Sequence, residues 1–186
     1  VSSKNNLQVF PFEGFNFPSG VIKFQKTRFV GRNLEISFKG ANFASGSVFF
    51  DQAAFEGEIA FNDIVMEDGQ FSFLNTDFPS VDISFQGANF GNSTVYFGDV
   101  DFNDGHFSFS DVTLNSGTAS FYKCNFGKGE IDFGSTSFGK SDVHFEGTVF
   151  NDAVFFTDLK NPRDIEYFTF KYSVFNGPLD INTHRG

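Results

Sequence analysis

Residues 83–106 read ISFQGANFGNST followed by VYFGDVDFNDGH, two copies of a twelve-residue pattern that decides the fold. Phe85 and Phe97 hold the same position in the two copies, and Phe90 and Phe102 follow them by five residues. A Phe of the first kind recurs at fourteen positions, namely 12, 24, 38, 50, 61, 73, 85, 97, 109, 121, 133, 145, 156 and 170. Between the fifth and the twelfth of these the spacing is always twelve. Such a short tandem repeat predicts a solenoid.

Each repeat has four apolar slots, which Ile83, Phe85, Ala88 and Phe90 fill in the first copy above. Ile83 and Phe85 form one pair, and Ala88 and Phe90 form a second. The two members of each pair are two residues apart, the period of a strand, but the step from Phe85 to Ala88 is three. A straight strand cannot keep all four on one side, whereas a chain that turns a corner between the pairs can. We therefore expect short strands joined by corners. The regular Gly at positions 46, 69, 105, 117 and 129 is expected at corners with positive φ.

The length of one coil follows from the size of the core. A coil of one repeat would enclose too little space for two Phe rings and a β-branched residue on every rung of ~4.8 Å. Two repeats per coil leave room for four rings, so about seven coils of ~24 residues are expected at this strand spacing. A coil of one repeat remains the alternative. The fold class is all-β, a parallel β-helix with a Phe-rich core, and residues 1–186 form one such domain or a piece of a longer repeat protein.

Three short stretches carry a family resemblance. Residues 88–92 (ANFGN) and 41–45 (ANFAS) resemble pentapeptide repeats, and residues 95–99 (VYFGD) are a looser copy. The chain thus resembles the pentapeptide-repeat proteins, with two residues added after every second pentapeptide. The resemblance implies a right-handed β-helix with four faces. It also implies a homodimer through the C-terminal end, since members of that family often pair end to end, and DNA mimicry toward a type II topoisomerase.

Composition excludes several classes of ligand. The formal net charge of −10 disfavours nucleic acid and anionic membranes as direct ligands, because both would be repelled. No apolar run approaches the roughly 20 residues of a membrane-spanning helix. A single cysteine, Cys124, allows no internal disulfide and leaves the compartment open, with the cytoplasm slightly favoured. A basic protein surface is the partner that this charge accommodates best.

The acidic residues are concentrated in the middle of the chain. From Gly40 to Tyr122 there is no Lys or Arg, and twelve acidic residues all fall in outward slots: Asp51, Glu56, Glu58, Asp63, Glu67, Asp68, Asp77, Asp82, Asp99, Asp101, Asp104 and Asp111. Coils of ~24 residues would place Asp77 directly beneath Asp101, with Asn125 next. The candidate partner-binding residues are Asp63, Asp77, Asp99, Asp101, Asp104 and Asp111. A plain solvated surface that resists aggregation is the alternative.

No residue cluster predicts catalysis, a metal or a cofactor. Residues 99–105 superficially resemble a calcium loop, but the repeat points Val100 and Phe102 inward and no Glu follows. His106, His144 and His184 share no spacing suited to a metal site. Cys124 holds the small inward slot, which favours a buried, inert thiol. We therefore expect a scaffold and not an enzyme.

The repeat is interrupted in two places and breaks off at its end. Residues 30–34 and 162–167 should bulge from a corner as insertions. Residues 179–181 (LDI) begin another repeat that then stops. An open solenoid end exposes apolar rings, so we expect a partner, a second copy or a further domain to cover it. The alternative function is a rigid structural or adhesion module of a larger secreted, effector or fibre protein.

Overall fold

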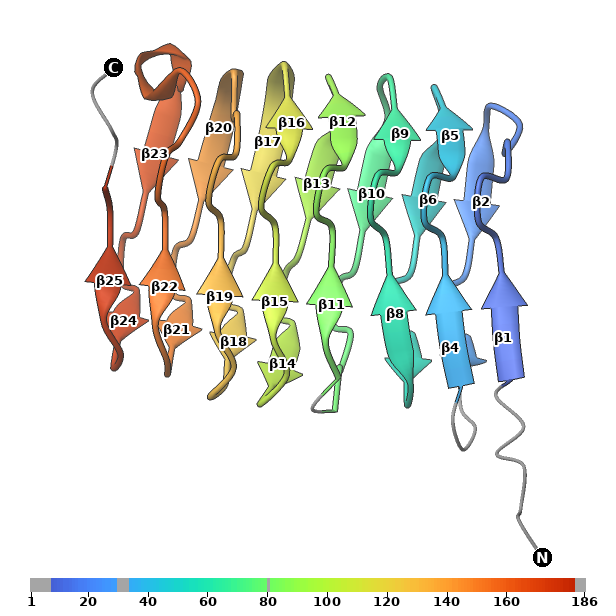
Figure 1. Ribbon diagram of the computed structural model, residues 1–186, viewed down its shortest axis with the longest axis horizontal. Helices are drawn as coiled ribbons and strands as arrows, with labels where there is room; N and C mark the ends of the chain where they lie inside the picture. Colours follow the sequence, from blue (N-terminus) through green and yellow to red (C-terminus); the bar gives the residue numbers. More distant parts are fainter. Residues whose placement is uncertain (1–7, 30–33, 80, 183–186) are drawn as a thin grey trace, which may run out of the picture.

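The computed structural model describes residues 8–29, 34–79 and 81–182, which form a parallel β-solenoid whose coils stack along one axis (Figure 1). Ile83 pairs with Phe107 of the following coil, a step of two repeats. The coil of ~24 residues is therefore confirmed. The solenoid completes about six turns, slightly fewer than the seven expected. Each coil has four faces, named A to D here in chain order.

Two long sheets form faces A and C. Face A contains the eight strands β1 (Gln8–Pro11), β4 (Leu34–Ser37), β8 (Glu58–Ala60), β11 (Ile83–Ser84), β15 (Phe107–Ser108), β19 (Ile131–Asp132), β22 (Val154–Phe155) and β25 (Leu179–Asp180). Face C contains the seven strands β2 (Val21–Lys23), β6 (Ser47–Phe49), β10 (Gln70–Ser72), β13 (Thr94–Tyr96), β17 (Ser116–Ser120), β20 (Lys140–His144) and β23 (Tyr167–Thr169).

Shorter strands form faces B and D. Face B contains β5 (Asn42–Ala44), β9 (Val65–Met66), β12 (Asn89–Gly91) and β16 (Thr113–Leu114). Face D contains the pair β3 (Arg28–Phe29) and β7 (Ala54–Phe55), then β14 (Asp101–Asn103), β18 (Asn125–Phe126), β21 (Val149–Phe150) and β24 (Val174–Phe175). Isolated bridges from Asp77 to Ala54 and to Asp101 join the two sheets of face D.

The core consists of columns of stacked Phe rings. On face C the ring centroids of successive coils are 4.8 to 5.2 Å apart along Phe24, Phe50, Phe73, Phe97, Phe121, Phe145 and Phe170. This distance follows from the strand spacing of ~4.8 Å, because each ring stands on the next rung. Rings of adjacent columns meet edge to face, as Phe85 and Phe97 do at 5.5 Å. Both arrangements are favoured by the aromatic quadrupole.

Where a Phe is missing from its slot, a neighbouring ring fills the space. Met66 stands in a Phe slot of face B, and the ring of Phe71 lies 5.9 Å from Phe43 and 5.5 Å from Phe90, the Phe residues one coil below and above. Asn161 likewise replaces a Phe, and Phe168 packs against Phe138 at 6.1 Å. The exceptions to the repeat therefore preserve core volume.

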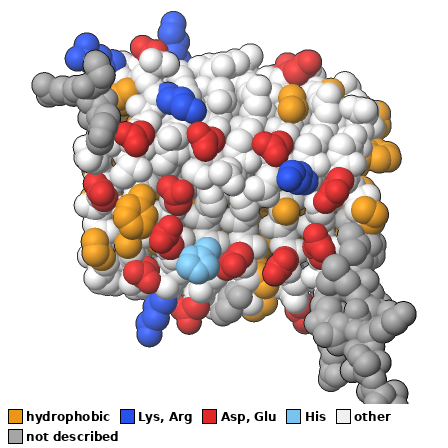
Figure 2. All heavy atoms as spheres, in the orientation of Figure 1, with side chains coloured by type: hydrophobic (Ala, Val, Ile, Leu, Met, Phe, Trp, Pro, Cys, Tyr) orange, Lys and Arg blue, Asp and Glu red, His pale blue; other side chains and the backbone are white. Residues whose placement is uncertain are grey.

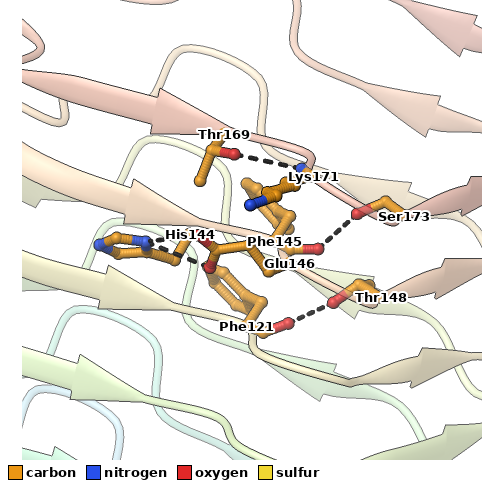
Figure 3. Close-up of polar contacts among 8 residues, drawn as sticks. All are labelled: Phe121, His144, Phe145, Glu146, Thr148, Thr169, Lys171 and Ser173. Atoms are coloured by element: carbon orange, nitrogen blue, oxygen red, sulfur yellow. Dashed lines mark hydrogen bonds and ion pairs between the residues drawn. The ribbon is translucent and has the colours of Figure 1, made fainter.

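Polar residues in the small inward slot bond to the backbone of the preceding coil. Figure 3 shows Thr148 donating its hydroxyl to the carbonyl oxygen of Phe121, and Ser173 donating to that of Phe145. The hydroxyl of Thr136 donates in the same way to Phe109 at 2.6 Å. The carbonyl oxygens of Phe121 and Phe145 also accept the backbone N–H of Cys124 and Thr148, so the hydroxyls are their second partners and tie each corner to the next coil.

The prediction of positive φ at the repeated glycines is wrong for Gly46, Gly105 and Gly129. Only two of the five, Gly69 and Gly117, have positive φ, at 111° and 110°. Gly105 is required by space instead, since a Cβ there would lie 2.1 Å from the carbonyl oxygen of Val81. Positive φ occurs mainly two residues after the first Phe of a repeat, at Gly14, Lys26, Gly40, Gln52, Asp63, Asn75, Gly87, Asp99, Asp111, Lys123, Ser135, Gly147, Asp158 and Tyr172.

One insertion is seen and the other lies mostly outside the described residues. Residues 162–167 project from the corner between faces B and C, where the exposed 3₁₀ turn η1 (Pro162–Asp164) precedes β23 (Figure 1). In the expected bulge at residues 30–34, only Leu34 is described, and it is buried in β4. Across the described ranges, no helix is both long enough and apolar enough to cross a membrane.

Candidate binding surface

The six candidate acidic residues lie around the solenoid and not on one face. Asp101 is partly exposed and the other five are exposed. The set divides between the corner of faces A and B (Asp63, Asp111), the corner of faces C and D (Asp99), face D itself (Asp77, Asp101) and the corner of faces D and A (Asp104). A single partner docking from one side would contact only some of them.

The expected column of Asp77, Asp101 and Asn125 is confirmed by their parallel pairing. Hydrogen bonds explain how two carboxylates can occupy neighbouring rungs. Asn103 donates its side-chain amide to Oδ1 of Asp77 at 2.9 Å and its backbone N–H to Oδ1 of Asp101 at 2.9 Å. The amide of Asn125 also donates to Asp101, at 3.2 Å. These two acids therefore have a structural role, whatever else they bind.

Asp104 has a similar structural role at the corner between faces D and A. Its Oδ1 accepts the backbone N–H of Lys128 in the next coil at 3.0 Å. One coil earlier, Asp82 accepts the backbone N–H of His106 at 2.9 Å. Each carboxylate satisfies a backbone donor where the strands have ended. In contrast, the side chains of Asp63 and Asp99 accept no hydrogen bond from the residues that the structure describes, and the αL backbone at both positions suits Asp.

Face A carries an acidic column that sequence reasoning missed. Glu35, Glu58, Asp82, His106 and Glu130 occupy the same outward slot in five successive coils, with Glu35 directly paired to Glu58. All of them except Glu130 border a shallow hollow of about 310 Å³ over β8, β11 and β15. In Figure 2 a histidine stands in a row of acidic side chains, and few basic ones interrupt them. The spacing of 23 or 24 residues was the signal available in the sequence.

Together with the adjoining corner, this column forms what we call the acidic front, made of Glu35, Glu58, Asp63, Asp82, Asp111 and Glu130. Lys160 partly neutralises the edge of the acidic front, because the Nζ of Lys160 lies 3.3 Å from Oδ1 of Asp111. His106 accepts the backbone N–H of Glu130 at Nδ1, 3.2 Å away. When the ring of His106 is neutral, its proton is therefore on Nε2, so His106 is a hydrogen-bond donor in the column between Asp82 and Glu130.

Cys124 lies in the core, in an environment that makes its thiol unreactive. The thiol is buried and lies 3.0 Å from the carbonyl oxygen of Phe97, to which it donates. Burial raises the pKa of this thiol well above its ordinary value, because the thiolate would lose its hydration. Val100 and Phe102 also point inward, as the repeat predicted, so residues 99–105 do not fold as a calcium loop.

Comparison with known proteins does not add to this description. No protein-family model matches the chain, and no curated protein sequence matches it either. The likeness to pentapeptide-repeat proteins therefore rests on the architecture, a stack of parallel coils with a repeated core. The outward side chains are the features of the chain that bear on its function.

Proposed function

We propose that the chain is a non-enzymatic scaffold whose acidic front binds a basic protein surface. The observation that supports this is the regular column of Glu35, Glu58, Asp82 and Glu130 on face A. Like charges directly opposite one another on adjacent strands are mildly destabilising, so the column costs stability in the free protein. A partner that brings Lys or Arg side chains to successive rungs would offset that repulsion and associate faster through electrostatic steering.

A specific form of this proposal is DNA mimicry toward a type II topoisomerase, which the family resemblance suggests. The acidic front presents carboxylates at intervals of ~4.8 Å along a rigid axis. Double-stranded DNA presents phosphates in a similarly regular array, and its partners bind it largely through Lys and Arg. An acidic rod of this kind would compete with DNA for such a basic surface.

Removal of charge from the acidic front tests both forms. The triple variant Glu35→Gln, Glu58→Gln, Asp63→Asn removes three charges, and within the described part of the chain none of these carboxylates accepts a hydrogen bond. Wild type should inhibit supercoiling by a bacterial gyrase and bind a decalysine peptide. The variant should bind the peptide about tenfold more weakly, because three exposed pairs at ~0.5 kcal/mol each amount to about 1.4 kcal/mol.

The matched control is Glu56→Gln, Asp99→Asn, Asp142→Asn, which removes the same charge from faces C and D and the corner between them. It should retain most of the binding. Equal loss in both triple variants would mean that net charge, and not the front, attracts the peptide. No effect of wild type on gyrase at micromolar concentration would eliminate the topoisomerase form alone.

A second candidate is a rigid structural module whose end is covered. The last described coil leaves Leu179 and Ile181, which hold inward slots of the repeat, exposed at the end of the solenoid. Exposed apolar side chains and unpaired strand edges at a solenoid end favour stacking with a second copy or another domain. A homodimer through this end is the simplest such arrangement.

Light scattering on the chain tests the covered end. We expect the mass of a dimer at high micromolar concentration, because burying this end removes apolar surface from water. Leu179→Lys together with Ile181→Lys should restore the monomer mass, whereas Val21→Lys at the other end of the solenoid should not. A monomer at every concentration would contradict self-association through this end.

A further inference from the structure

All four tyrosines of the chain lie on one side of the solenoid. Tyr96 and Tyr167 point outward from β13 and β23 of face C, and Tyr122 and Tyr172 occupy the corner between faces C and D. Tyr96, Tyr122 and Tyr172 border an open groove of about 550 Å³ that crosses the rungs from β13 to the corner after β23. We call this the tyrosine groove. Residues 76 positions apart in the sequence thus share one site.

The position of Tyr96 is supported by a glycine. A Cβ on Gly98 would lie 2.7 Å from Cδ2 of Leu74 and 2.8 Å from Cε1 of Tyr96, so both side chains pack against the backbone of Gly98. The φ of Gly98 lies outside the positive range, and hence its backbone conformation does not require glycine. The same slot holds Leu74 one coil below and Tyr122 one coil above. Glycine at this slot therefore makes room for the ring.

Polar groups line the groove between the rings. Figure 3 shows His144 beside Glu146, with Nδ1 of the histidine 3.2 Å from Oε2 of the glutamate, and Lys171 on the next rung. Ser120 separates Tyr96 from His144 along the column of outward side chains. Donors and acceptors thus lie among the aromatic rings over four rungs.

The charge of the groove differs from that of the whole chain. Glu146 and Lys171 offset one another within it, whereas the chain has a net charge of −10. Nζ of Lys171 also lies 4.9 Å from the ring centroid of Tyr172, and Nζ of Lys123 lies 5.1 Å from that of Tyr122, so each of these rings has an ammonium group over one face. Aromatic faces with neutral hydrogen-bonding groups suit a ligand that has apolar patches and many hydroxyls.

We propose that the tyrosine groove binds a linear, neutral polysaccharide. The apolar faces of hexopyranose rings would stack on Tyr96, Tyr122 and Tyr172, which lie on the first, second and fourth rungs of the groove, and sugar hydroxyls would bond to His144 and Glu146. The rungs are ~4.8 Å apart, roughly the length of one sugar unit in an extended glycan, so successive units meet successive rungs. This binding is independent of the acidic front, which lies on another side of the coil.

The composition provides a direct assay. The chain has no Trp, so its near-ultraviolet fluorescence comes from these four tyrosines. Titration with cellohexaose should change that emission, and electrophoresis through gels containing hydroxyethylcellulose or galactomannan should retard the protein. Tyr122→Ala and Tyr172→Ala should each weaken binding about two- to tenfold, the value of one aromatic contact.

Two further variants separate binding from folding. Phe155→Ala removes an outward aromatic ring from face A and should leave binding unchanged. Gly98→Ala should displace the ring of Tyr96 and weaken binding, and the clash with Cδ2 of Leu74 is with the end of a flexible side chain that can move. Circular dichroism checks that each variant is folded. Absence of retardation with both polymers and of any fluorescence change would overturn the proposal, as would equal binding by Tyr122→Ala and Phe155→Ala.

Discussion

Phe97→Ala is expected to lower the free energy of unfolding by about 3–5 kcal/mol, the usual cost of emptying a buried Phe site. Phe97 is completely buried near the middle of the solenoid. Its ring stacks between Phe73 at 5.1 Å and Phe121 at 5.2 Å, and it meets Phe85 edge to face at 5.5 Å. Adjacent coils cannot close over the gap, because the strand ladders hold them apart at a fixed spacing.

Urea denaturation followed by circular dichroism measures this loss. The matched control is Phe175→Ala in the last coil, where the ring is only partly buried and stacks on Phe150 from one side. Its loss should cost clearly less, because a solenoid is stabilised by nearest-neighbour contacts and the end coil has one neighbour. Equal losses at the two positions would contradict the view that the stacked column supplies the stability.

The fold could be predicted because its determinants are local and repeated. The apolar pattern of each repeat indicates which residues point inward. Because the Phe rings are large, they fit inside a coil of two repeats and not inside a coil of one. The compensation at Met66 was not predictable, since it depends on Phe71 turning toward another face. The reason for Gly105 was also missed, because the contact with Val81 lies between coils and leaves no trace in the repeat.

The candidate site was predicted only in part. The column of Asp77 and Asp101 followed from a constant spacing of 24, whereas Glu35 and Glu58 share a column at a spacing of 23. Such a slip is absorbed at a corner. Tyr96 and Tyr122 hold different slots of the repeat, on face C and at its corner with face D, so the spacing of the repeat does not bring them together. The hydrogen bonds that restrain Asp101 and Asp104 come from neighbouring coils, and the sequence of one repeat does not reveal them.

The two proposed surfaces make different demands on the scaffold. The acidic front lies on face A and its corner with face B, whereas the tyrosine groove lies on face C and its corner with face D. Both use positions whose side chains leave the core untouched, so each can vary without loss of the fold. The Phe columns and the close contacts between coils are the features that cannot vary in this way.

Gly127→Ala is expected to be the most damaging of the small substitutions, costing about 3 kcal/mol or more, at the upper end of the usual range for overpacking. A Cβ at Gly127 would lie 1.6 Å from the carbonyl oxygen of Asn103 and 2.2 Å from its carbonyl carbon. Asn103 adopts a φ of 48° and interrupts the regular ladder between β14 and β18. This irregularity brings its carbonyl group against the next coil, where only glycine fits.

Gly40→Asn is the matched control, because Gly40 has a positive φ of 64° but its Cβ would have no neighbour closer than 4.0 Å. Asp63 and Asp111 hold the equivalent corner in later coils, and Asn tolerates the αL conformation equally well. In urea denaturation, the free energy of unfolding of this variant should lie within about 0.5 kcal/mol of the wild-type value. If Gly127→Ala were equally neutral, the coils would have to separate locally at little cost, and the close stacking at Asn103 would not limit the sequence. If the two variants differ as expected, steric contact between coils is what requires glycine at position 127. At position 40 only the positive φ matters, and Asn adopts it as well as glycine does.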